Sequence, residues 1–130
     1  MSHWMITGAS GLLGLNFVLA VDGRQHQVTG VDDRHPLGWI SFKTRQADLT
    51  EPGIIEKLVK EIKPDVILHC AAMANVDVCE NRPQEAQRVN AELPGEIAAS
   101  ARKHSIKMVH ISTDAVFDGQ KGNYTENDTP

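Results

Sequence analysis

The chain has 130 residues, of which 41% are hydrophobic and 23% are charged, and its formal net charge is −4. This length suits one domain with a hydrophobic core of its own. The acidic balance and the 5% aromatic content argue against a nucleic-acid partner, which usually needs a positive face.

Apolar segments alternate with glycine, proline and charged residues along the chain. In chain order we expect a strand at 3–7, a helix at 12–21 that stops at Asp22-Gly23, strands at 27–31 and 44–48, a helix from 50 to 62, a strand at 65–70, a helical segment from about 84 to 104 and a strand at 106–111. Loops are expected at 32–40 and from residue 112 onward, and small residues dominate 71–83. The alternation predicts an α/β fold of the Rossmann type, a doubly wound parallel sheet of about five strands.

Two proline signals refine the helices. Thr50-Glu51-Pro52 is expected to begin the second helix, because it offers a capping hydroxyl, an acid near the positive end of the helix dipole and a proline in the first turn. Pro94 is expected to kink or split the long segment, since proline removes a hydrogen bond and clashes with the preceding turn.

A glycine-rich segment, TGASGLLG, occupies residues 7–14 between the first predicted strand and the first predicted helix. In that context glycine permits a tight turn and lets the backbone approach a pyrophosphate, which the amides at the helix start then face. Asp32 follows Gly14 by 18 residues, near the spacing of about 20 at which an acid holds the adenosine ribose. The segment predicts a dinucleotide site; the alternative is that its glycines only shape a turn.

The residues after the second strand bear on which dinucleotide is bound. Asp32 and Asp33 favour NAD(H), because a carboxylate repels the 2′-phosphate of NADP(H). Arg34 follows directly and could instead pair with that phosphate. The prediction is NAD(P)H with a preference for NAD(H).

The spacing GxxGxxG resembles that of the extended short-chain dehydrogenase/reductase superfamily. Asp48-Leu49 resembles an Asp-Leu pair whose acid contacts the adenine, HCAAMANVDVCE resembles the alanine-rich turn along the cofactor, and RVNAELPGEIA resembles the Val-Asn-Ala helix. The closing HISTDAVFDGQKGNYTENDTP most resembles dTDP-4-dehydrorhamnose reductases. Taken with the glycine turn, the resemblance implies cofactor contacts at Gly8, Ser10, Gly11, Leu12, Leu13, Gly14, Asp32, Arg34, Asp48, Leu49, Cys70, Ala71, Ala72, Ala74, Asn90 and Ser112.

The resemblance implies reduction of a 4-keto sugar nucleotide by hydride transfer from a nicotinamide. A tyrosine protonates the oxygen, and a lysine four residues later lowers its pKa. Thr113 matches the hydroxyl that bonds the carbonyl, although a strand-end threonine can equally bond local backbone. Tyr124 is not the matching tyrosine, because Asp128 stands four residues later. Ala115 replaces a tyrosine common in the family, so the resemblance does not identify which sugar is the substrate.

We therefore expect residues 1–130 to form the N-terminal, NAD(P)-binding part of the family fold, which is incomplete in this chain and catalytically inert alone. A second reading is a non-catalytic dinucleotide-binding protein of the same fold, since the regulatory β subunit of methionine adenosyltransferase resembles this family too.

The remaining expectations concern partners and location. The resemblance implies a nucleotide-sugar substrate. It is also compatible with a homodimer. The apolar run at 12–21 is too short to span a bilayer, no signal peptide is visible, and Cys70 and Cys79 have no CxxC spacing. We expect a cytoplasmic protein with no membrane partner. No metal site is expected either, because the histidines lack ligand spacing.

Overall fold

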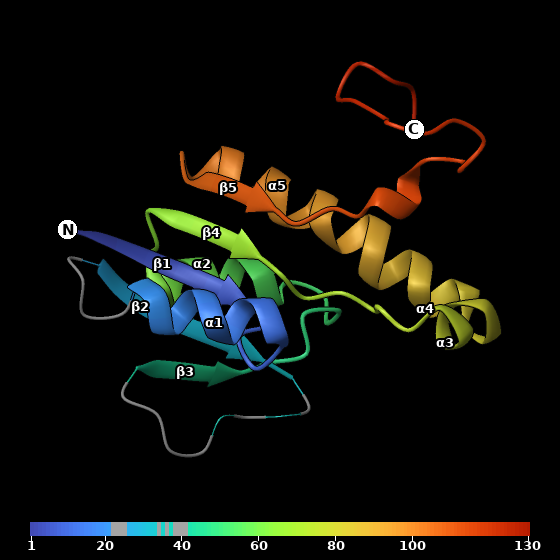
Figure 1. Ribbon diagram of the computed structural model, residues 1–130. Helices are drawn as coiled ribbons and strands as arrows, with labels where there is room; N and C mark the ends of the chain where they lie inside the picture. The colour runs from blue at the N-terminus through green and yellow to red at the C-terminus, as the bar shows by residue number, and fades with distance from the viewer. Residues whose placement is uncertain (22–25, 34, 36, 38–41) are drawn as a thin grey trace.

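The computed structural model describes residues 1–21, 26–33, 35, 37 and 42–130. Five strands form one parallel sheet in the order β3-β2-β1-β4-β5 (Figure 1). The strands are β1 (Ser2–Thr7), β2 (His26–Asp32), β3 (Lys43–Gln46), β4 (Val66–His69) and β5 (Lys107–His110). Each lies within two residues of its expected bounds, and the Rossmann-type sheet is confirmed.

Helices lie on both faces of this sheet. Helix α1 (Leu12–Val21) covers one face, and α2 (Ile54–Ile62) and α5 (Leu93–Lys103) lie on the other (Figure 1). Two hydrophobic clusters result, because neighbouring residues of a strand point to opposite faces: Ile6 and Leu68 pack on the α1 side, and Met5 on the α2 and α5 side. Each of these buried side chains contributes roughly 1.5–3 kcal/mol by leaving water.

The start of α2 differs from the prediction. The helix begins at Ile54 after Gly53, which has a left-handed φ of 78°. Thr50 does not cap it, because its hydroxyl and its N–H both donate to Asp48 Oδ1, at 2.6 and 2.8 Å. The prediction was wrong because this local turn, typical of aspartate, competes for the same hydroxyl.

The segment before β5 is more divided than its sequence indicated. Helix α3 (Val76–Asn81) lies inside the small-residue stretch and was not anticipated, although Asn75 caps it by accepting the Val78 N–H at 3.0 Å. Helix α4 (Pro83–Gln87) continues into a π-helical segment, Arg88–Glu92, and then into α5. The irregularity expected at Pro94 is thus a widened turn, in which the Leu93 N–H donates to the Arg88 carbonyl five residues back.

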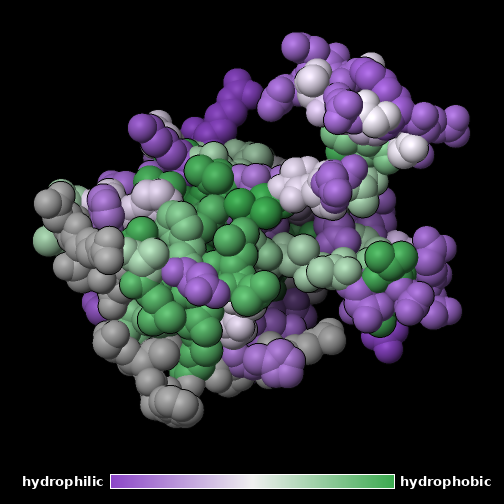
Figure 2. All heavy atoms as spheres, viewed as in Figure 1, coloured by the Kyte–Doolittle hydropathy of each residue, from purple (hydrophilic) through white to green (hydrophobic). Residues whose placement is uncertain are grey.

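Two further features of the molecule are a hydrophobic area on one face and the segment that follows β5. Hydrophobic residues gather on the face that carries α1 (Figure 2). The exposed large hydrophobic side chains include leucines of α1 and, at the end of the sheet's last strand in the chain, Val109 and Ile111. Residues after β5 form a short 3-10 turn, Asp114–Val116, and then an irregular segment that stands away from the sheet (Figure 1).

The predicted stop of α1 at Asp22-Gly23 and most of the predicted loop at 32–40 lie outside the described residues. Within the described ranges, no helix is both long and apolar enough to cross a membrane.

Candidate dinucleotide site

A cavity of about 340 Å³ opens at the carboxyl ends of β1, β2 and β4. Strand order reverses between β1 and β4, and ligands of open α/β sheets bind in the crevice at such a switch point. Its lining comes from four segments and one helix face: Gly8, Ser10, Gly11; Val31, Asp32, Asp33, His35; Ala47, Asp48, Leu49, Thr50; Cys70, Ala71, Ala72, Met73; Glu85, Val89, Leu93.

The turn after β1 requires glycine at two positions. Gly8 has a φ of 64°, and a Cβ there would lie 2.8 Å from the Ala71 nitrogen. A Cβ at Gly14 would overlap the Gly8 carbonyl oxygen and lie 2.9 Å from its carbon. Gly11 is less restricted, since its Cβ would lie 3.2 Å from the Gly8 oxygen. The turn therefore brings the backbone close to the cavity wall. The amides of Gly8, Ser10 and Gly11 donate within the protein, to the Val31 carbonyl, Asp32 Oδ1 and the Gly8 carbonyl.

Asp32 links the end of β2 to this turn. Its side chain is only 4% exposed, and Oδ1 accepts the Ser10 N–H at 2.7 Å. Oδ2 is buried and has no hydrogen-bond partner among the described residues. An unpaired buried carboxylate oxygen is unfavourable, so this atom offers an acceptor to a hydroxyl donor in the cavity. A ribose hydroxyl fits that requirement.

The opposite wall, residues 48–50, is tied to the helices. Asp48 accepts two hydrogen bonds from Thr50, and the Thr50 carbonyl accepts from Arg88 Nη2 at 3.1 Å. Arg88 also contacts both carboxylate oxygens of Glu96, at 2.7 and 3.1 Å, which raises the pKa of Arg88. Arg88 was not predicted as a site residue, yet it holds this wall in place.

The loop after β4 forms the third wall. Asn90 was predicted to contact the cofactor, but both polar atoms of its side chain bond the Met73 backbone: Oδ1 accepts the N–H at 2.8 Å and Nδ2 donates to the carbonyl at 2.9 Å. Cys79 Sγ donates to the same carbonyl at 3.1 Å. Burial raises the pKa of the Cys70 thiol, as expected for a packed rather than a reactive cysteine.

Several predicted residues lie elsewhere. Leu12 and Leu13 stand exposed at the start of α1, and Gly14 packs on Gly8 behind the cavity. Arg34 lies outside the described residues. Ala74, Asn90, Ser112 and Thr113 do not line the cavity.

Thr113 accepts the Ala115 N–H at 3.1 Å and caps the 3-10 turn that follows. The local backbone bond considered from the sequence is therefore present.

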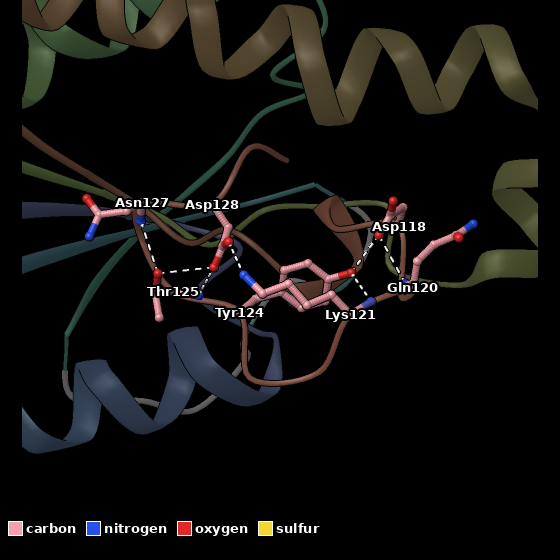
Figure 3. A network of polar contacts seen from close by, with 7 residues as sticks. All are labelled: Asp118, Gln120, Lys121, Tyr124, Thr125, Asn127 and Asp128. Atoms are coloured by element: carbon pink, nitrogen blue, oxygen red, sulfur yellow. Dashed lines mark hydrogen bonds and ion pairs between the residues drawn. The ribbon is translucent and has the colours of Figure 1, made fainter.

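Tyr124 belongs to a self-contained loop rather than to the cavity (Figure 3). Its hydroxyl donates to Asp118 Oδ1 at 2.5 Å and accepts the Lys121 N–H at 2.8 Å, while its ring stacks on Phe117 at 4.4 Å. The Tyr124 hydroxyl lowers the pKa of Asp118. Lys121 and Asp128 pair across the same loop. This network ties the Tyr124 side chain to its own loop.

Eight of the eighteen lining residues had no part in the sequence prediction of the site. They are Val31, His35, Ala47, Thr50, Met73, Glu85, Val89 and Leu93. The last three recur every four residues, a spacing that places side chains on one helix face and could have indicated them. Within the described part of the chain, no three His, Cys, Asp or Glu side chains are placed to hold a metal ion.

A parallel sheet with a glycine turn at its switch point and a buried acid at the end of β2 defines a Rossmann-type nucleotide-binding fold. More narrowly, the chain belongs to the RmlD substrate binding domain family, whose model matches residues 2–130.

Two curated relatives illustrate the family. The chain is 37% identical over 127 residues to the probable low-salt glycan biosynthesis reductase Agl14 of Haloferax volcanii, covering 96% of this chain and 42% of that protein. It is 32% identical over 126 residues to methionine adenosyltransferase 2 subunit beta of Bos taurus, covering 97% of this chain and 36% of that protein. The chain thus spans about two-fifths of the length of these relatives.

Solved structures agree with the fold. A hypothetical dTDP-4-dehydrorhamnose reductase from Sulfolobus tokodaii superposes with a TM-score of 0.89 at 38% identity, covering 98% of this chain and 45% of that one. A dTDP-4-dehydrorhamnose reductase from Bacillus anthracis in complex with NADP superposes with a TM-score of 0.76 at 27% identity, covering 93% and 39%.

Proposed function

We propose that this chain is the coenzyme-binding part of an NAD(P)-dependent reductase that acts on a 4-keto sugar nucleotide. The observation that carries the proposal is the buried Asp32 Oδ2, an acceptor without a partner among the described residues, beside the glycine turn. The relatives support the reaction class, since one is named a glycan biosynthesis reductase and a solved neighbour is a sugar reductase with NADP.

Three walls of the cavity would hold the dinucleotide. The amides at the start of α1, directly after Gly11, would face a pyrophosphate. Asp32 would accept from the adenosine ribose, and Asp48 and Leu49 would border the adenine. The loop at Ala71 and Ala72 lines the remaining side. When bound, the reduced nicotinamide supplies the hydride that reduces the keto carbon.

The proposed role of this chain is to bind the coenzyme, not to donate the proton of the reaction. Residues 1–130 contain no tyrosine followed four positions later by lysine, so we propose coenzyme binding without turnover for this chain alone. Thr113 and Ser112 would orient the substrate carbonyl from the end of β5. The Thr113 hydroxyl is exposed, accepts the Ala115 N–H and donates to Asp114 Oδ1 at 3.3 Å. It would turn this proton from Asp114 to the carbonyl oxygen, which can only accept.

We expect the cavity to prefer NAD(H) to NADP(H), because Asp32 Oδ2 is buried and has no partner among the described residues. A 2′-phosphate on the adenosine ribose would add negative charge beside Asp32, whereas a 2′-hydroxyl can donate to it.

Titration calorimetry with NADH and NADPH tests the proposal on the folded chain. We expect both to bind, NADH more tightly. Binding of neither coenzyme by a sample with the circular dichroism of an α/β protein would refute it. Asp77→Asn, which removes an exposed acid on α3 away from the cavity, is the matched control and should bind like the wild type.

A second candidate is a non-catalytic subunit, favoured by the similarity to methionine adenosyltransferase 2 subunit beta. The two candidates separate in an assay of the full-length gene product with NADH and a 4-keto sugar nucleotide. Oxidation of NADH supports the reductase, and coenzyme binding without oxidation supports the subunit.

A further inference from the structure

Three polar side chains stand in one row across the sheet. Thr7, His69 and His110 face one another at the last paired positions of β1, β4 and β5. Thr7 and His69 are completely buried, on the same face as Met5, which α2 and α5 cover. His69 Nδ1 lies 2.6 Å from Thr7 Oγ1, and its ring stacks on that of His110 with centroids 5.3 Å apart. The row ends where the loop that lines the cavity begins.

The Thr7 side chain joins this row to the loop. Its hydroxyl oxygen accepts the Ala71 N–H at 3.3 Å, and its carbonyl accepts the Cys70 N–H at 3.2 Å. A hydroxyl has one proton and two lone pairs. With one lone pair on the Ala71 N–H, the hydroxyl can give its proton to His69 Nδ1. In that arrangement the ring of His69 is neutral and carries its own proton on Nε2.

Burial favours the neutral ring that this arrangement requires. Burial, with a smaller contribution from His110, lowers the pKa of His69 to about 4, so that the ring is neutral at ordinary pH. Nε2 is buried and has no partner among the described residues, so a proton there is an unpaired donor, which is unfavourable. The bond that Nδ1 makes to the Thr7 hydroxyl is what an aliphatic residue could not supply.

We propose that His69 is a positioning residue of the dinucleotide site: it takes the proton of the Thr7 hydroxyl and so directs a lone pair at the Ala71 amide, which holds the loop against the glycine turn. The gap is narrow, since a Cβ on Gly8 would lie 2.8 Å from the Ala71 nitrogen and 2.9 Å from its Cα. Gly8 and Ala71 both line the cavity. The effect on binding rests on the proposed coenzyme function; the effect on the loop does not.

Nuclear magnetic resonance of the 130-residue chain tests the positioning directly. We expect the ¹⁵N shifts of His69 to report the tautomer protonated at Nε2. In His69→Leu the acceptor is lost, and the Ala71 amide should exchange with solvent about 5-fold faster, the size expected for one neutral hydrogen bond. In His69→Asn the side-chain oxygen replaces Nδ1 as acceptor, and exchange should stay within about 2-fold of the wild type. Unchanged exchange in His69→Leu would overturn the proposal.

A matched control exists at the other end of the sheet. His26 Nδ1 lies 2.7 Å from Ser2 Oγ, a similar imidazole–hydroxyl pair between β1 and β2. His26→Leu should leave the Ala71 amide unchanged, and faster exchange there would also contradict the proposal, because the effect would be general loosening of the sheet.

Calorimetry with NADH extends the test to the coenzyme. His69→Leu should weaken binding about 5-fold and His69→Asn less than about 2-fold. If the wild type binds no coenzyme, the proposed function fails, while the exchange data still decide whether His69 positions the loop. If Leu and Asn variants bind equally well, the positioning proposal fails and the proposed function stands.

Discussion

The substitution Asp32→Asn separates coenzyme binding from stability. The asparagine Oδ1 can still accept the Ser10 N–H, now at 2.7 Å from Asp32, so the turn keeps its anchor. At the position of Asp32 Oδ2, a neutral amide nitrogen replaces the charged, unpaired oxygen. The variant thus isolates the one buried atom of Asp32 that has no partner among the described residues.

The two expected effects have opposite signs. A hydrogen bond to a charged group contributes about 1.5–3 kcal/mol and a neutral one about 0.5–1.5 kcal/mol, so NADH binding should weaken by about 1–1.5 kcal/mol, or roughly 5- to 10-fold. NADPH should lose less, because a repelling charge is also removed. The Ser10 bond also changes from a charged to a neutral one, a loss of about 1–1.5 kcal/mol. Removal of the unpaired buried charge offsets this by at least about 1–3 kcal/mol, so stability without coenzyme should be unchanged or somewhat higher.

Calorimetry measures the affinities, and urea unfolding followed by circular dichroism measures stability. A variant that unfolds at lower urea but binds NADH as before would refute this reasoning, because Asp32 would then serve the fold alone. Equal losses for NADH and NADPH would remove the preference for NAD(H).

Three further predictions concern the turn, the helices and the loop. Gly14→Ala should destabilise the chain by more than about 3 kcal/mol or prevent folding, because its Cβ would overlap the Gly8 carbonyl; urea unfolding measures this. Glu56 accepts from Ser100, Lys103 and His104, and its pKa is lowered from 4.5 to about 2, chiefly by Lys103. Because the folded pKa is the lower one, this stabilisation is present above about pH 4.5 and is lost as the pH falls to about 2; the difference in melting temperature between wild type and Glu56→Gln should therefore disappear over that window. Asn90→Ala should free the Met73 backbone and weaken NADH binding about 5- to 150-fold, as expected for two hydrogen bonds that together contribute about 1–3 kcal/mol; calorimetry measures the change.

Each of these has a control and a contradicting result. Gly95→Ala, in α5 with nothing within 4 Å of the added Cβ, should stabilise by about 0.5–1 kcal/mol, and equal effects of the two alanines would contradict the steric argument. For Glu61→Gln, on the exposed side of α2, the melting-temperature difference from the wild type should not change between about pH 4.5 and pH 2. A melting-temperature difference for Glu56→Gln that does not depend on pH would contradict the ion-pair explanation. Asn16→Ala removes an exposed bond on α1 and should not alter binding, so a similar loss there, or none at Asn90, would contradict the loop argument.

Local patterns predicted the elements well where burial and local preference agree. Helix α1 has the expected bounds at residues 12–21, and α2 buries Ile55, Leu58, Val59 and Ile62 as their helical spacing indicates. The error at the start of α2 falls where two groups compete for one hydroxyl, because Asp48 takes the Thr50 hydroxyl that was expected to cap the helix. The irregularity expected at Pro94 is present as a π-helical turn before it.

The sequence by itself determined the class of fold, the glycine turn and the acid at the end of β2, because each rests on residues close together in the chain. Only the tertiary structure decided what these residues face. Gly8 must be glycine because Ala71, distant in sequence, lies against it. Asn90 holds Met73, Arg88 holds Thr50, and His69 contacts Thr7. Parallel strands are joined through crossovers, so the contacts that shape this cavity join residues from separate parts of the chain, and no local pattern reports them.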